Sequence, residues 1–312
     1  MDIRRWQPTA GSTAPDARVR SPRPPLLLLA SLLLLCWLPG DDAAAQRRSG
    51  RGYKRTQAPR AKARKRRVRW RVKRGKVAGG RHWRISSRRG VIHVYRPPGY
   101  RHRRAGLVLF VHGYFVSVDR TWHGHGLPQQ FRSSRQNALF IAVSGPKGPK
   151  ERVMFPSLRE VLRLVARKGR LRMPRRPQVV VMAHSSGIRT VSRWIGHRAL
   201  GHVILLDAFF SARKKFYAWM ATDRLRQWHR LTLVGGRSTS NCLTLLARFK
   251  GARGVVKRRS IPKRYEDFST RERWARLLFL KPQYGHSALV YNRKVIPVLL
   301  RRTRLRAIKT RN

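Results

Sequence analysis

The feature that most constrains the fold is a series of short apolar runs separated by amphipathic stretches, from about residue 90 to residue 300. Strands that alternate with helices in this way are typical of an α/β domain with a mostly parallel sheet. The run AGLVLFVHGYF is apolar at consecutive positions, as expected of a central strand with both faces buried. Strands are expected at 91–98, 105–115, 137–145, 178–183, 201–210, 230–237 and 276–282.

The segments between these runs predict helices that cover the sheet. In SLREVLRLVARKG, Ser157 and Glu160 have the spacing of a capping box, and the leucines and valines that follow share one face. Further helices are expected around 188–195 and 290–300. The sequence therefore predicts one α/β domain over residues 90–312, with a mostly parallel sheet flanked by helices.

The first 45 residues have the pattern of a secretory signal peptide. Basic residues precede an apolar run at 26–38, and the small triplet AAA precedes Gln46, where we expect cleavage. The run has 13 residues, fewer than the roughly 20 that a spanning helix needs. We therefore expect export to the periplasm, the cell surface or the medium. Only Cys242 would remain after cleavage, so no disulfide within the chain is expected.

Residues 46–89 contain no acidic residue and are rich in arginine and lysine. The whole chain has 73 basic and 12 acidic residues, a formal net charge of +61. Such composition predicts a disordered basic arm. The arm either binds nucleic acid, another anionic polymer or a membrane surface without sequence preference, or is a solvated linker in an arginine-rich chain. The sequence leaves both interpretations open.

The stretch QVVVMAHSSGIRT predicts a catalytic serine. A strand, the pentapeptide AHSSG and a helix have the layout of a nucleophile elbow, in which Ser185 occupies a tight turn. Ala183 and Gly187 are small, as the close approach of strand and helix requires. The backbone N–H of Ser186 would then serve an oxyanion hole. We expect His184 to pack beside the nucleophile rather than to act as a second base.

Four stretches together resemble the α/β-hydrolase fold family: LVLFVHGYF, VVVMAHSSGIRT, VILLDAFF and GHSALVYNRKVIPVLL. The resemblance covers about residues 91–300 and extends to uncharacterised secreted bacterial serine hydrolases. It implies that His112 and Gly113 belong to the oxyanion loop and that the N–H of Tyr114 is the second oxyanion donor. An ordinary turn at His112 and Gly113 is the alternative.

The family's chain order of nucleophile, acid and base implies the other two catalytic residues. His286 is the only histidine after His229 and lies before the last expected helix. Asp207 ends the strand HVILLD, whereas the loop after the next strand has no carboxylate. A helix cap or an arginine partner is the alternative role for Asp207. The other carboxylates of the interval are Asp223, Glu266, Asp267 and Glu272, of which Asp223 is the second choice.

The resemblance implies a serine hydrolase that cleaves a carboxylic ester, thioester or amide through an acyl-enzyme, with no cofactor and no metal. His123 and His125 are expected in a loop at the rim of the site rather than in a metal centre. The alternative is a non-catalytic polycationic protein that binds anionic envelope polymers or nucleic acid on a hydrolase-like scaffold. An acyl-containing substrate is the expected partner, and the sequence gives no oligomeric state.

Overall fold

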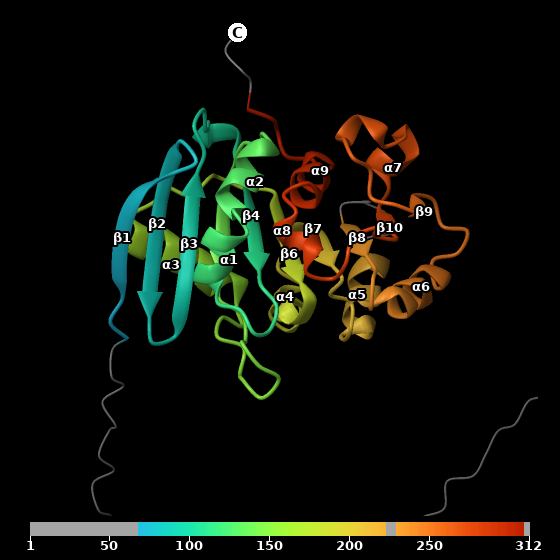
Figure 1. Ribbon diagram of the computed structural model, residues 1–312, viewed down its shortest axis with the longest axis horizontal. Coiled ribbons are helices and arrows are strands. Elements are labelled where there is room, and N and C mark those ends of the chain that lie inside the picture. Colours follow the sequence, from blue (N-terminus) through green and yellow to red (C-terminus); the bar gives the residue numbers. More distant parts are fainter. Residues whose placement is uncertain (1–67, 223–228, 309–312) are drawn as a thin grey trace, which may run out of the picture. The chain divides into compact units, whose positions relative to one another are not determined.

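The computed structural model describes residues 68–222 and 229–308 (Figure 1). The expected signal peptide, residues 46–67 of the expected arm, and Asp223 lie outside the described residues. Export and the cleavage before Gln46 therefore stay predictions.

One ten-stranded sheet organises the described chain, in the order β1-β2-β3-β5-β4-β6-β7-β8-β10-β9. From β5 to β9 all neighbouring strands pair in parallel, whereas β1, β2 and β3 are antiparallel. The predicted α/β class with a mostly parallel sheet is confirmed. The strands are β1 Arg71–Val77, β2 Gly80–Ser87, β3 Gly90–Arg96, β4 Gly106–Val111, β5 Ala138–Val143, β6 Val179–His184, β7 Leu200–Leu206, β8 Arg230–Val234, β9 Val255–Arg258 and β10 Leu277–Leu280.

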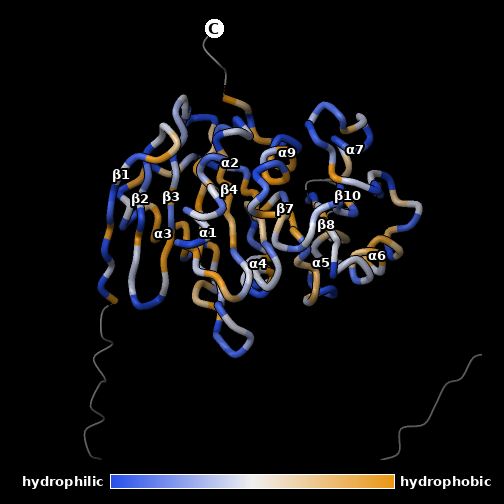
Figure 2. Tube along the Cα trace, viewed as in Figure 1, coloured by the Kyte–Doolittle hydropathy of each residue, from blue (hydrophilic) through white to orange (hydrophobic). Residues whose placement is uncertain are grey.

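Helices cover both faces of the sheet and form two hydrophobic cores (Figures 1 and 2). Consecutive side chains of a strand point to opposite faces, so Leu107 and Leu109 enter one core while Val108 and Phe110 enter the other. The first core receives α3 Leu158–Gly169, α4 Ile188–Trp194, α5 Arg213–Ala221 and α6 Thr239–Ala247. The second receives α1 Val118–Gly124, α2 Leu127–Ser133, α8 Ala288–Tyr291 and α9 Val295–Arg301. The short α7 spans Thr270–Trp274.

The prediction of disorder up to residue 89 is wrong for residues 71–87, which form the hairpin β1–β2. Ala78 and Gly79 connect the two strands, both with positive φ (46° and 73°), as in the tight turns that match the twist of a hairpin. Trp83 and Ile85 occupy alternate positions of β2 and are buried in the first core. The arginines dominated the composition and masked this period of two, which is the signal of a strand.

The predicted helices are present, with two differences at their ends. Ser157 caps α3 as expected, because its side chain accepts from the N–H of Glu160. The Glu160 carboxylate instead pairs with Arg89, so the reciprocal half of the capping box is absent. The helix expected over 290–300 is two helices, α8 and α9, and Arg293 lies between them with φ 60°.

Two arginines are buried without a carboxylate side chain among their hydrogen-bond partners. Arg230 donates to the carbonyl oxygens of Arg273, Ala275 and Arg302. Arg302 donates to the carbonyl oxygens of Glu272 and Ala275 and to the Thr232 hydroxyl. Burial lowers the pKa of Arg230 to about 10. Main-chain oxygens and the Thr232 hydroxyl thus satisfy both guanidinium groups at the end of the sheet where β8 and β10 begin.

None of the helices in residues 68–222 and 229–308 has the length and apolarity needed to span a bilayer.

Candidate active site

The residues singled out in the sequence lie at one edge of the sheet. Gly113 follows β4, Ser185 follows β6 and Asp207 follows β7. These strands are neighbours and run parallel, so their carboxyl ends meet at the same edge, where α/β proteins bind ligands. The structure therefore brings together three loops that are far apart in the chain.

Ser185 occupies the strand-to-helix turn that the sequence predicts. It follows β6, opens a short 3-10 turn and has φ 51°, a left-handed conformation that is unusual for a residue with a side chain. A Cβ on Gly187 would lie 2.6 Å from the Val111 carbonyl oxygen, and a Cβ on Gly113 would lie 2.8 Å from Ser185 Cβ. Backbone therefore packs against the elbow at both glycines, which explains the need for small residues.

Asp207 and His286 are joined by a hydrogen bond. His286 Nδ1 lies 2.7 Å from Asp207 Oδ2, so Nδ1–H donates to the carboxylate. The Asp207 side chain is fully buried, whereas that of His286 is 19% exposed. A buried carboxylate that holds Nδ1–H leaves Nε2 of the imidazole free to accept a proton.

The loop after β8 supplies four more hydrogen bonds to Asp207. Oδ1 accepts from the N–H of Gly236 (3.0 Å) and from the N–H and hydroxyl of Ser238 (both 2.8 Å), and Oδ2 accepts from the N–H of Arg237 (3.0 Å). Burial raises the pKa of Asp207, but the hydrogen bonds from His286, Ser238 and Arg237 together hold it well below its usual range. The carboxylate is therefore ionised at neutral pH.

His184 connects the elbow to the loop of His286. Its Nε2–H donates to the backbone carbonyl oxygen of His286 at 3.0 Å, and the two rings lie 4.6 Å apart between centroids. Burial, with His286 nearby, lowers the pKa of His184 to about 4. No hydrogen bond joins the Ser185 hydroxyl to His286 in the described chain. The structure thus pairs Asp207 with His286 and places Ser185 next to the residue that holds His286.

The loop after β4 lies against the elbow. Gly113 contacts Ser185, and the N–H of Tyr114 has no backbone acceptor among the described residues, whereas the N–H of Phe115 donates to the Lys147 carbonyl. The N–H of Ser186 lies in the first turn after β6, where a helix leaves N–H groups without partners. The assignment of Tyr114 and Ser186 as oxyanion donors stays a prediction.

His112 fixes the shape of this loop from within the protein. Its side chain is buried; Nδ1–H donates to the Gly113 carbonyl at 2.6 Å, and Nε2 accepts from the N–H of Gly145 at 3.0 Å. Burial lowers its pKa, which favours this neutral form. His112 is therefore a structural link between the loops that follow β4 and β5.

Sequence reasoning missed Arg189, which lies in α4 one turn after Ser185. Its guanidinium donates to the Tyr114 hydroxyl at 2.7 Å and to the carbonyl oxygens of Gly148, Pro149 and Glu151. It therefore ties the expected oxyanion loop and the loop after β5 to the elbow helix. With 73 basic residues in the chain, nothing in the sequence distinguished this arginine from the others.

His123 and His125 were expected in a loop, but His123 lies in α1 and His125 directly follows it. Within the described ranges, no group of three or more histidine, cysteine, aspartate or glutamate side chains could hold a metal ion. Cys242 is buried in α6, and burial raises its pKa to about 12.

No family model and no curated protein matches the chain. Among solved structures, the chain is similar to the feruloyl esterase module of Clostridium thermocellum, at 10% identity and a TM-score of 0.46, over 74% of this chain and 87% of that one. It is similar to an S-formylglutathione hydrolase from Agrobacterium tumefaciens, at 13% identity and a TM-score of 0.40, over 73% and 95%. EstE1, a carboxylesterase from a metagenomic library, has 12% identity and a TM-score of 0.44, over 75% and 88%. At these identities the likeness concerns the fold alone.

Proposed function

We propose that the protein is a serine hydrolase that cleaves carboxylic esters through an acyl-enzyme. Ser185 Oγ attacks the ester carbonyl carbon and its proton passes to His286 Nε2, which then protonates the leaving alcohol. Water then attacks the acyl-enzyme carbonyl carbon and gives a proton to His286 Nε2. His286 passes this proton to Ser185 Oγ as the acid is released. Asp207 holds Nδ1–H of His286, and the N–H groups of Tyr114 and Ser186 receive the oxyanion. The scheme uses side chains and backbone of this chain throughout.

The observation that carries the proposal is the Asp207–His286 hydrogen bond beside a serine in a left-handed turn. A buried aspartate that only stabilised the fold would have no need of a partly exposed imidazole. The five hydrogen bonds keep the carboxylate charged, as is needed to stabilise the imidazolium that forms during the reaction. Strained backbone at both Ser185 and Asp207 (φ 51° and 42°) is typical of functional sites.

Exposed aromatic residues support an apolar group on the substrate. Phe115, Phe210 and Tyr291 are 86%, 43% and 53% exposed, and each follows an expected site residue by one to five positions. Phe115 has φ 62°, a conformation that a bulky residue adopts only where the fold imposes it. Exposed apolar side chains that gather beside a site are suited to contact an apolar part of a ligand. We infer that the esters preferred by the enzyme carry an aryl or extended alkyl group.

Labelling with a fluorophosphonate probe tests the nucleophile. Wild-type protein is expected to be labelled, and Ser185→Ala is expected to lose the label completely. Ser186→Ala is the matched control, because it removes a neighbouring hydroxyl but keeps the backbone N–H assigned to the oxyanion hole. Absence of labelling in the folded wild type, or equal labelling of Ser185→Ala, would overturn the proposal.

A panel of p-nitrophenyl esters of increasing chain length then tests the substrate. Hydrolysis is expected for the wild type and for Ser186→Ala, and no burst of nitrophenolate is expected for Ser185→Ala. If anilides are cleaved as fast as the esters, the ester assignment is wrong.

A further inference from the structure

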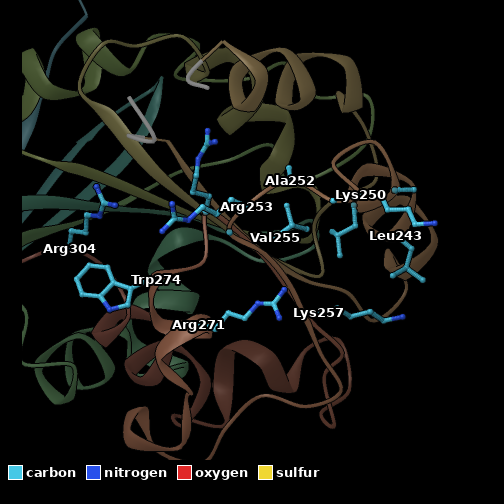
Figure 3. A pocket seen from close by; sticks show the side chains of 14 residues that line it. Leu243, Lys250, Ala252, Arg253, Val255, Lys257, Arg271, Trp274 and Arg304 are labelled. Atoms are coloured by element: carbon cyan, nitrogen blue, oxygen red, sulfur yellow. The ribbon is translucent and has the colours of Figure 1, made fainter. Parts of the chain in front are cut away.

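A hollow of about 1150 Å³ lies along the outer edge strand β9 and is lined by residues of α6 and α7 (Figure 3). It includes the residues just before β9 and β10, Gly254 and Arg276. The candidate active site lies at the opposite, carboxyl end of the parallel strands. A ligand in the hollow is therefore a second ligand. The lining residues are Leu243, Leu246, Ala247, Lys250, Gly251, Ala252, Arg253, Gly254, Val255, Lys257, Arg271, Trp274, Arg276 and Arg304.

The hollow is strongly cationic. No acidic residue is among those that line it, and Lys250, Arg253, Lys257, Arg271 and Arg304 are exposed. None of these five forms an ion pair in the described part of the chain. Five like charges that form no ion pair with the described residues, placed around a concave surface, attract an anion.

Trp274 adds a flat apolar surface to this cationic hollow. Its side chain is 64% exposed, unlike Trp122 and Trp194, which are buried. In Figure 3 the Trp274 indole lies on one side of the hollow, with Arg304 and Arg271 labelled on either side of it. An exposed indole between cations is suited to stack on a planar group that is linked to negative charge.

The size and shape of the hollow favour one kind of anion. Pockets for small molecules usually measure about 300–1,000 Å³, so a hollow of about 1150 Å³ has room for several units of a chain. Paired bases of a duplex are stacked on each other and do not offer a face to an indole inside a concave surface. A flat membrane surface does not follow a concave wall. Single strands offer both phosphates and unstacked bases.

We infer that the hollow beside β9 binds single-stranded nucleic acid, with phosphates on its lysines and arginines and a base stacked on Trp274. Binding has no sequence preference, because stacking and phosphate contacts do not distinguish bases. This site is independent of the proposed hydrolase activity, and Ser185→Ala leaves it intact.

Fluorescence anisotropy with the full chain tests the stacking step. The probes are a labelled twelve-residue oligothymidylate and an abasic strand of equal length and charge, at physiological ionic strength. Basic residues elsewhere in the chain contribute equally to both probes, so the ratio of the two affinities isolates the bases. We expect the wild type to prefer the oligothymidylate by on the order of tenfold. Trp274→Ala is expected to remove the preference and Trp274→Phe to keep most of it.

Salt titration tests the phosphate contacts. For single strands each phosphate contact contributes about 0.7 to the slope of log affinity against log salt. The double substitution Lys257→Ala/Arg271→Ala is expected to lower the slope by about 1.4, while the matched pair Lys73→Ala/Arg74→Ala on β1 changes it by less than half as much. Equal changes in the two variants would show that the charge of the hollow has no special role and would overturn the proposal.

Two further results would also overturn it. The first is a preference for the oligothymidylate that survives Trp274→Ala. The second is a sulfated polysaccharide that competes with the oligothymidylate and whose affinity falls in Trp274→Ala by the same factor as that of the oligothymidylate. The indole would then stack on sugar rings.

Discussion

Replacement of Asp207 by asparagine changes one heavy atom and is expected to abolish the proposed hydrolase activity. Oδ1 accepts three donors, from Gly236 and Ser238, so the amide oxygen of the asparagine must take this place. The amide nitrogen then occupies the place of Oδ2, facing His286 Nδ1 and the N–H of Arg237. An NH₂ group can only donate to Nδ1. The imidazole is therefore held with its proton on Nε2, where it cannot act as the base for Ser185.

The expected loss of kcat is about 10⁴-fold, the cost of the wrong tautomer in catalytic triads. The cost in stability is about 1–3 kcal/mol, because the N–H of Arg237 loses its buried acceptor. Ester hydrolysis gives kcat, urea unfolding gives the stability, and nitrogen-15 NMR of the imidazole gives the tautomer of His286. Ser238→Ala is the control, since it removes one hydrogen bond to Asp207 but leaves the bond to His286.

The refuting result is a folded Asp207→Asn variant whose kcat stays within tenfold of the wild type. Asp207 would then be a structural residue that caps the loop after β8. If Glu266→Ala or Asp223→Ala were inactive instead, the acid would have been assigned to the wrong carboxylate.

Three more predictions follow from the same structure. Burial lowers the pKa of His93, in β3, to about 3 and that of His184 to about 4, below the unfolded value of 6.5. The unfolded state therefore binds more protons, and stability falls as pH drops from about 6.5 towards 4. The slope is at most about 1.4 kcal/mol per pH unit for each histidine, and urea midpoints at pH 7 and pH 5 measure it; equal midpoints would contradict it. Gly113→Ala places a methyl group 2.8 Å from Ser185 Cβ and is expected to cost about 1–3 kcal/mol and most of the probe labelling, whereas normal labelling would show that the loop can move. Phe115→Ala leaves thermal stability unchanged, because the side chain is 86% exposed, but raises KM for long-chain and aryl esters relative to acetate; an equal effect on all esters would separate Phe115 from substrate binding.

Much of the fold could be predicted because its central strands consist mostly of apolar residues. Strands β3 to β8 and β10 are buried along most of their length. Few charged residues therefore occur in them, and their apolar runs are visible in the sequence. The outer strands behave differently. β1 is exposed at most positions and β9 has no buried residue, and an edge strand that faces solvent in an arginine-rich chain has the composition of a loop.

Those parts of the candidate site that depend on the identity of a single residue could be predicted. Ser185 was indicated by the small residues around it, and Asp207 by its place at the end of an apolar strand. The backbone donors of residues 236–238 could not be predicted, because an N–H group has no sequence signature. The pairing of His184 with the carbonyl of His286 required the close approach of two loops about a hundred positions apart.

The buried arginines have a consequence for the behaviour of the protein in acid. Arg230 and Arg302 both donate to carbonyl oxygens, and a carbonyl neither gains nor loses a proton at any pH in which proteins are handled. The hydrogen bonds of these two arginines are therefore indifferent to acidity, unlike an ion pair such as that of Arg89 with Glu160. A change of acidity therefore reaches the fold through other groups, the paired carboxylates such as Asp119 and the buried histidines such as His93.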